Sequence, residues 1–220
     1  MHTFATTAPI TAVVDIPAGR VQLIAAHRAD ATVEVRPATA GKSRDVNAAE
    51  RTTVDFTDGV LRVTTPDTNQ ILGSSGFVEV TVQLPAGSRL RAKAASADLR
   101  GVGRLGEVTF DGSHGIIKID EAASARLRTD AGDVTIGRLT GPAEITTSKG
   151  DIQITEATGG ELTLSTQAGN VTVDAAPGVS ATLDAGTGYG RVTNSLKNDG
   201  TPALTINATT AYGDIVARSL

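Results

Sequence analysis

The sequence predicts an all-β fold, a parallel β-solenoid in which the chain winds into stacked coils of about 18–20 residues. The first observation is a phrase of glycine, a small polar residue and a β-branched strand that recurs in the second half of the chain. Its glycines are Gly132, Gly150, Gly169, Gly190 and Gly213, at steps of 18 (132 to 150), 19 (150 to 169), 21 (169 to 190) and 23 (190 to 213). Such a period indicates one supersecondary unit that is copied and stacked.

Two further observations support the same fold. Helical periodicity is almost absent, and short runs of alternating apolar and polar residues dominate, as is typical of half-buried strands. Aromatic residues make up only 3% of the chain, whereas hydrophobic residues make up 40%. Because a thick core usually draws on aromatic bulk, this composition favours a thin core of Ala, Val, Ile, Leu and Thr.

Composition also limits the function. The chain contains no cysteine, so disulfides and thiolate metal sites are excluded. Its formal net charge of −4 disfavours non-specific attraction to nucleic acid or anionic lipid. The N-terminus lacks the basic region of a secretory signal, and no run approaches the roughly 18 apolar residues that span a bilayer. We therefore expect a cytoplasmic protein without membrane insertion, without a nucleic-acid partner and without a cofactor.

The chain is predicted to form a single domain over residues 1–220, in which residues 1–90 are irregular strands that cap the regular stack. Strand patterns occupy residues 21–24, 31–36, 53–56, 60–63 and 78–84. Asp58-Gly59 separates two of them, and both residues tolerate the positive φ of a tight hairpin. Residues 38–52 favour a short helical turn, and residues 67–76 are typical of a surface excursion.

Residues 91–220 carry the regular repeats, each with two strands. In the repeat 132–149 the first strand covers 133–136 and the second covers 143–147, with a turn between them. Apolar residues alternate with Thr, Arg or Glu, which predicts alternately inward and outward side chains. The glycines then lie where the coil turns a corner, a position that backbone geometry explains without chemistry.

Several motifs are shared with a known family. They are Pro17-Ala18-Gly19-Arg20-Val21, Thr32-Val33-Glu34-Val35-Arg36-Pro37 and the repeated Ala-Gly-Asp-Val and Lys-Gly-Asp-Ile phrases. The chain that carries them resembles, over residues 10–218, a bacterial β-strand-repeat family of unknown function that is catalogued as "putative adhesin" and also called the toast-rack domain. The resemblance implies a parallel β-solenoid without known catalytic residues, and it supplies no site residues because that family has no agreed active site.

A column of mostly acidic residues follows the corner positions, and three of its members are candidate binding residues. The column is Asp98, Asp133, Asp151, Asn170, Arg191 and Asp214, and the candidates are Asp133, Asp151 and Asp214. Carboxylates stacked about 4.8 Å apart could bind Ca²⁺ together with backbone carbonyls. The nine-residue repeat of calcium β-rolls is absent, and Ile116 and Arg191 interrupt the column. We therefore favour the alternative in which these side chains hydrogen-bond the backbone of the turn, and we expect no metal site.

A second column precedes the corner glycines and contains the only two tyrosines of the chain. Its members are Ser96, His114, Ala131, Lys149, Ala168, Tyr189 and Tyr212. Tyr189 and Tyr212 are candidate binding residues, because an aromatic patch suits a sugar ring or a protein partner. The alternative is a stacked pair that seals the C-terminal end of the solenoid.

No residues form a recognisable catalytic site, so we expect no catalytic residues and no enzyme activity. The principal functional hypothesis is a rigid interaction or scaffold module that binds another protein or a second copy of itself. Its last repeat, residues 211–217, would leave an open edge that favours edge-mediated homodimers. The other hypothesis is a carbohydrate-binding or polysaccharide-cleaving β-helix that uses Tyr189 and Tyr212, with acid pairs such as Asp130 and Asp133 available for cleavage.

Overall fold

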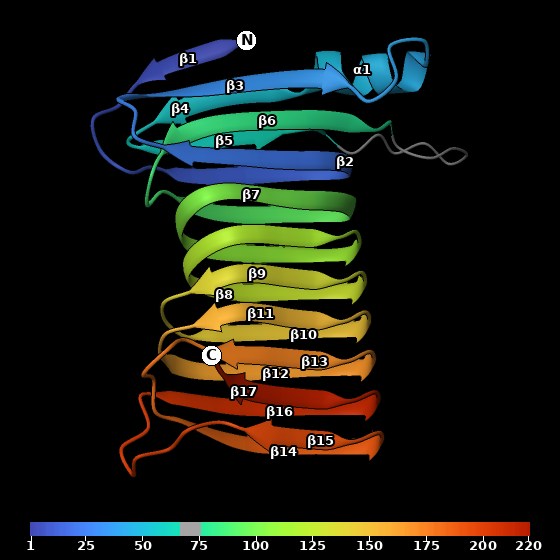
Figure 1. The fold of residues 1–220 in the computed structure, drawn as a ribbon. Coiled ribbons are helices and arrows are strands. Elements are labelled where there is room, and N and C mark those ends of the chain that lie inside the picture. Colours follow the sequence, from blue (N-terminus) through green and yellow to red (C-terminus); the bar gives the residue numbers. More distant parts are fainter. Residues whose placement is uncertain (67–75) are drawn as a thin grey trace.

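The computed structural model, which describes residues 1–66 and 76–220, is a stack of β-strands closed at one end by a cap (Figure 1). Within these residues it contains seventeen strands and a single helix. The fold is therefore all-β and solenoid-like, as the repeat predicts. Most of the surface excursion expected at residues 67–76 falls on residues 67–75, which lie outside the described part of the chain.

Each regular coil contributes one strand to each of two faces, which meet at a bend on the right-hand side of Figure 1. Face I, which precedes the bend, contains β10 (Ala143–Lys149), β12 (Gly160–Ala168), β14 (Ala181–Tyr189) and β16 (Leu204–Tyr212). Face II, which follows it, contains β9 (Val134–Leu139), β11 (Ile152–Ala157), β13 (Val171–Ala175), β15 (Val192–Ser195) and β17 (Ile215–Ser219). Three longer strands bend and contribute to both faces: β2 (Thr11–Ala26), β7 (Arg89–His114) and β8 (Ile117–Ala131).

The core lies between the two faces and is built from stacked columns of small and branched side chains. In β10, for example, Ala143, Ile145 and Thr147 are buried, whereas Glu144 and Thr146 are exposed. The register then places each inward residue directly over its counterpart in the next coil. A single cluster of buried apolar residues extends in this way from Ile10 to Ala217. The predicted alternation along the strands is confirmed.

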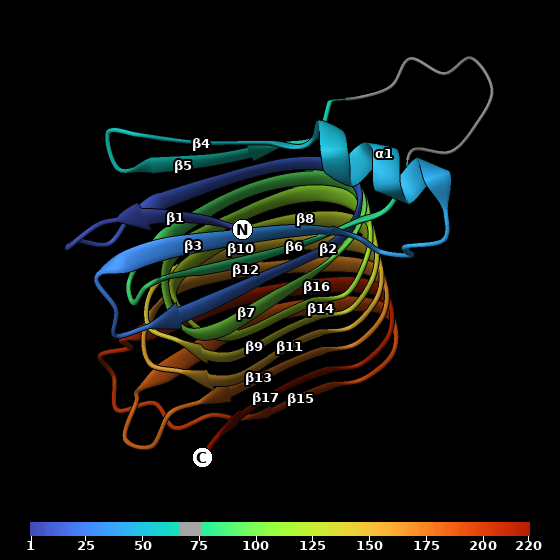
Figure 2. The same cartoon turned by 90° about the horizontal axis from the view of Figure 1, so that it is seen from above.

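Irregular N-terminal strands form the cap. Its parallel strands β5 (Val60–Thr64) and β6 (Val78–Pro85) pair with β2, and the antiparallel strands β1 (His2–Ala5), β3 (Asp30–Pro37) and β4 (Thr53–Thr57) extend it outward. The β4–β5 hairpin turns at Asp58 and Gly59, with φ of 52° and 73°. Helix α1 (Ser43–Arg51) confirms the helical turn expected within residues 38–52, and it packs beside β3 at the margin of the cap (Figure 2).

The predicted order of the coils is wrong at the C-terminal end. The last repeat, residues 211–217, was expected to leave an open edge. Instead, β16 and β17 pair with β12 and β13 on one side and with β14 and β15 on the other. The chain thus leaves β13, builds the terminal coil β14–β15 and then returns, so that β16 and β17 fill the level between the β12–β13 coil and the terminal coil (Figure 1). The edge without a paired strand belongs to β14 and β15.

The inward residues explain this order. The register aligns Leu183, Ala185, Val192 and Asn194 of the terminal coil with Ile206, Ala208, Ile215 and Ala217 of the inserted coil. All four of these residues of the inserted coil are apolar and buried. The terminal coil instead directs Asn194 inward, and this residue is exposed. A polar inward side chain is tolerated where solvent reaches it but is costly between two other coils.

A bidentate ion pair further fastens the inserted coil. Arg218 on β17 donates from Nε to Asp174 Oδ1 at 2.7 Å and from Nη2 to Oδ2 at 2.9 Å, and Asp174 on β13 is buried. These hydrogen bonds hold the pKa of the Arg218 guanidinium above its usual value. Planar fork-to-carboxylate geometry is specific in direction, so the pair fixes the register between β13 and β17.

Candidate functional site

The bend between the two faces, called here the glycine corner, is built on a column of glycines. In stacking order they are Gly19, Gly115, Gly132, Gly150, Gly169, Gly213 and Gly190. All have φ between +139° and +159°, and a Cβ at any of them would lie 1.8–2.1 Å from a carbonyl oxygen of the neighbouring coil. Only glycine permits this backbone and this close approach, which confirms the structural explanation of the repeat.

The acidic column runs beside the glycines and forms a hydrogen-bonded ladder. The Oδ1 atom of Asp133 accepts the backbone N–H of Asp151 at 2.9 Å, and that of Asp151 accepts the N–H of Asn170 at 2.7 Å. The Asn170 side chain then accepts from Asp214 at 2.8 Å, and Asp214 accepts from Arg191 at 2.8 Å. The structure thus brings Asp133, Asp151 and Asp214 into one column, where each side chain satisfies a backbone donor of the next coil.

No group of three or more metal-ligating side chains is arranged around a common point anywhere in residues 1–66 and 76–220. The acids of the ladder stand in a single file along the stack, and Ile116 interrupts them above Asp133. One oxygen of each acid in the ladder is already directed at a backbone N–H. The geometry therefore favours turn stabilisation over cation binding for these residues.

A second ladder lies inside the corner and was not predicted from the sequence. A threonine three residues before the glycine directs its hydroxyl inward to the corner carbonyl of the neighbouring coil. Thr166 donates to Gly150 O at 3.0 Å, Thr210 to Gly169 O at 2.9 Å and Thr187 to Gly213 O at 2.9 Å. The signal was present as Thr-x-x-Gly at residues 129, 147, 166, 187 and 210. The two ladders together satisfy the backbone groups that the bend leaves unpaired.

The column that precedes the glycines projects outward from the corner, and its two tyrosines stack on each other. Tyr189 and Tyr212 face each other across β14 and β16, with ring centroids 5.1 Å apart and ring planes within 3°. They remain 71% and 61% exposed. The predicted stacked pair is therefore present at the C-terminal end of the solenoid, but it lies on the surface of the corner.

Shallow grooves follow the same corner towards the cap. One of about 510 Å³ is lined by Asp98, Gly115, Ile116, Ala131, Gly132, Asp133, Lys149, Gly150 and Ala168. A second of about 260 Å³ shares Asp98 and Gly115 with it and reaches Phe77 and Arg20 of the cap. A third groove, of about 350 Å³, lies on face I around Arg126 and Glu144. The first two grooves thus adjoin each other at Asp98 and Gly115.

Exposed apolar side chains gather on this corner. Seven large apolar or aromatic side chains are exposed in the described part of the chain: Met1, Phe77, Ile116, Tyr189, Val192, Tyr212 and Leu220. Four of them, Phe77, Ile116, Tyr189 and Tyr212, belong to the corner columns or line the corner grooves. Two of the remaining three lie at the ends of the chain, Met1 and Leu220. The corner thus carries four of these seven side chains, beside the exposed acids of the ladder.

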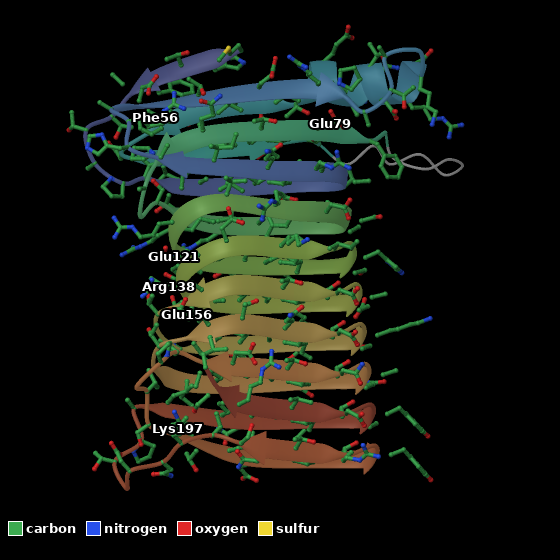
Figure 3. All side chains as sticks on the ribbon, viewed as in Figure 1. Phe56, Glu79, Glu121, Arg138, Glu156 and Lys197 are labelled. Carbon is green, nitrogen blue, oxygen red and sulfur yellow. The ribbon has the colours of Figure 1, made fainter. Side chains whose placement is uncertain are left out.

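The opposite edge of the stack has a different character. There Glu121, Arg138 and Glu156 lie one above another in successive coils (Figure 3). Arg138 Nε approaches Glu156 Oε1 at 3.6 Å, and the two side chains are 51% and 35% exposed. Opposite charges on neighbouring strands stabilise the pairing modestly. This edge therefore presents a column of alternating charges, whereas the corner combines exposed acids with exposed apolar side chains.

The family model of Toastrack DUF4097 matches residues 13–218, nearly the whole chain. The chain belongs to the Toastrack DUF4097 family. No curated protein is significantly similar in sequence. Solved structures are also similar to this chain over nearly its whole length.

Three of the similar solved structures come from Bacteroides fragilis, Parabacteroides distasonis and Clostridium sporogenes. A "putative adhesin" from Bacteroides fragilis has 10% identity and a TM-score of 0.48, and the match covers 98% of this chain and 95% of that one. One from Parabacteroides distasonis has 13% identity and a TM-score of 0.45, with the same coverage. A "putative cell adhesion protein" from Clostridium sporogenes has 12% identity and a TM-score of 0.42, covering 100% and 98%.

None of the described residues forms a helix with the length and apolar character required to cross a bilayer.

Proposed function

We propose that this Toastrack domain is a non-enzymatic interaction module and that it binds a protein partner along the glycine corner. The observation that carries the proposal is the gathering of Phe77, Ile116, Tyr189 and Tyr212 on that one corner. Exposed apolar side chains that are scattered singly need no explanation, whereas their concentration along one corner beside two grooves favours an interaction site. Tyrosine and other aromatic residues are also enriched at the centres of protein interfaces.

Rigidity of the corner supports the same proposal. Its backbone is held by the glycine column and by the two hydrogen-bonded ladders, so its outward side chains already have fixed spacing before a partner arrives. Binding to a preorganised surface loses less conformational entropy than binding to a mobile loop. A partner that matches the coil spacing therefore retains more of the free energy of its contacts.

The experiment is a cross-linked pull-down from the native cell with the wild-type protein, a corner variant and a face variant. The corner variant is Ile116→Ser with Tyr212→Ser, and the matched control is Thr163→Ala with Gln153→Ala, which alters exposed positions on the two faces. We expect the wild type and the control to recover one partner near one-to-one and the corner variant to lose it. Equal recovery by all three proteins would contradict the proposal.

A second copy of the chain is an alternative partner, favoured by the edge of the terminal coil. Strands β14 and β15 pair with β16 and β17 on one side only, and an edge of this kind is a template for further pairing. The edge-mediated homodimer predicted from the sequence is thus retained, but it moves from residues 211–217 to β14 and β15. A monomeric mass by light scattering at high protein concentration would dispose of this alternative.

Carbohydrate binding is a different candidate function, and the stacked tyrosines favour it. Tyr189 ends the stack, so one face of its ring is open to a sugar. If this function is correct, retention on a polysaccharide column should fall to background after Tyr189→Ala with Tyr212→Ala. Failure of the wild-type protein to be retained on any polysaccharide tested would end the candidate, including the polysaccharide-cleaving form predicted from the sequence.

A further inference from the structure

The outward column at the glycine corner has a vacant level beside its aromatic pair. The register places Lys149, Ala168, Tyr212 and Tyr189 at four successive levels of the stack. Three of these positions carry long side chains, whereas Ala168 carries a single methyl group and is exposed. A slot one level high therefore lies between Tyr212 and Lys149, with Ala168 as its floor. The corner groove extends to this floor from the other side of Lys149.

The height of the slot suits one flat ring. Lys149 and Tyr212 are two levels apart, which corresponds to about 9.6 Å at a strand spacing of about 4.8 Å. A ring at the level of Ala168 would lie about 4.8 Å from Tyr212, inside the range of roughly 4.5–7 Å in which aromatic pairs attract. The two tyrosines already stack at 5.1 Å across one level of the same column. A third ring would continue this stack by one step.

The two walls of the slot are chemically suited to the faces of an aromatic ring. Tyr212 offers a ring face that Tyr189 supports from behind. Lys149 forms no ion pair or side-chain hydrogen bond with any residue in the described part of the chain, so its ammonium group is available. A cation within about 6 Å of a ring centroid is attracted by the negative face of the ring. A sugar ring would use the tyrosine wall but would gain no cation–π attraction.

We propose that the slot over Ala168 receives an aromatic side chain of the partner protein, stacked on Tyr212 and covered by Lys149. This inference rests on the proposed function and gives it a specific anchor. Hot spots of protein interfaces are commonly aromatic side chains seated in a rigid pocket, and this slot has a fixed floor and one fixed wall. The partner is thus identified by a protruding Trp, Tyr or Phe.

The test uses the protein's own tyrosines as reporters. Because Tyr189 and Tyr212 are the only tyrosines and tryptophan is absent, the ring NMR signals of tyrosine come from this site alone. N-acetyl-L-tryptophanamide is the probe, titrated into wild-type protein beside methyl α-D-glucopyranoside at the same concentrations. We expect a saturable upfield shift of the Tyr212 ring signals with the indole and none with the sugar. An equal response to the sugar, or no response to the indole, would overturn the proposal.

Three variants make the test specific to the slot. Ala168→Leu fills it and should weaken the binding of the indole at least tenfold, whereas Lys149→Gln removes the cation and should weaken it about threefold. Ala131→Leu is the matched control, because Ala131 occupies the same column two levels away, on the other side of Lys149. Unchanged binding in Ala168→Leu, or an equal loss in Ala131→Leu, would refute the slot.

The same variants separate this inference from the broader function. If Ala168→Leu retains the partner in the pull-down while the Ile116→Ser, Tyr212→Ser variant loses it, the corner is an interaction surface but the slot is not its anchor. If both variants lose the partner and the Thr163→Ala, Gln153→Ala face variant keeps it, the slot anchors the partner.

Discussion

A side chain at a corner glycine should disrupt the stack, and Gly150→Ala is the sharpest case. Gly150 has a φ of +149°, and an added Cβ would lie 2.1 Å from the Gly132 carbonyl oxygen and 3.1 Å from the backbone nitrogen of Asp133. Both neighbours are backbone atoms, so no side-chain rotation relieves the overlap. The coils must separate locally, which weakens the ladder bonds on both sides of the corner.

The size of the effect follows from two contributions. Holding a residue with a side chain at an unfavourable φ costs about 1–3 kcal/mol. Weakening two backbone or ladder hydrogen bonds adds about 1 kcal/mol for each. We therefore expect Gly150→Ala to lower the free energy of unfolding by about 3–5 kcal/mol, a large part of the roughly 5–15 kcal/mol that is typical of a folded domain.

Urea unfolding followed by circular dichroism measures this change, with Gly186→Ala as the matched control. Gly186 lies in the middle of β14 without a positive φ, and an added Cβ would meet nothing within 4 Å. Its replacement should leave stability unchanged or raise it by up to about 1 kcal/mol. If Gly150→Ala cost less than about 1 kcal/mol, or no more than Gly186→Ala, close backbone approach could not be the reason for the repeat.

Three further predictions concern the coil order, the inner ladder and the connector to the inserted coil. Oxidation should close a disulfide in the Thr163→Cys, Asn207→Cys variant, because the register makes these positions neighbours, but not in Thr163→Cys, Asp184→Cys, whose positions lie two levels apart. Mass spectrometry of free thiols reports the result, and the reverse outcome would show that the coils stack in the order of the sequence. Thr166→Val removes the hydroxyl that satisfies a corner carbonyl and should lower the free energy of unfolding in urea by about 1–2 kcal/mol. The outward substitution Thr163→Val should lower it by less than about 0.5 kcal/mol, and equal losses would show that the inner ladder does not stabilise the corner. Hydrogen bonds to Asp199 lower its pKa in the folded protein, so its carboxylate contributes stability above the unfolded pKa, and this stability is lost as pH falls through the folded value. The urea midpoint of Asp199→Asn should therefore lie below that of the wild type at neutral pH, and the difference should shrink below about pH 4. A difference independent of pH would show that the carboxylate charge is not involved.

Most of the fold could be predicted from local sequence patterns, because the contacts of this solenoid are made between neighbouring levels. The period near 20 residues, the alternation of strands such as 143–147 and the corner glycines each report on one coil and the coil beside it. The Asp133 and Asp151 ladder was predictable for the same reason, since short acidic side chains commonly bond turn backbone. The threonine at position 166 was overlooked because threonine is ordinary in strands, and only its constant distance from the glycine sets it apart.

The order of the last two coils could not be read from the repeat. Gly190-Arg191-Val192 and Gly213-Asp214-Ile215 are equivalent phrases, and either could have stacked on the coil of Gly169. The order depends on which of the two coils tolerates solvent at its inward positions. The terminal coil does, because its inward residue Asn194 is polar and exposed. That comparison becomes possible only once the inward residues are assigned.

The corner surface was only partly visible in the sequence. Tyr189 and Tyr212 stand in the same column of the repeat, so their proximity was predictable, and their stacking followed from the strand spacing. Phe77 was not connected with them, because it reaches the corner through the irregular cap. Ile116 was read as an interruption of the acidic column, and its meaning as an exposed apolar side chain depends on the corner around it.

The most direct test of the central claim is site-specific photo-cross-linking in the native cell. A benzophenone amino acid is placed at Ile116 on the glycine corner in one protein and at Gln153, an exposed position on face II, in the other. If the corner is the interaction surface, the protein labelled at Ile116 forms a discrete cross-linked product with a partner and the protein labelled at Gln153 does not. A product from Gln153 alone, or the same product in equal yield from both positions, would contradict the account.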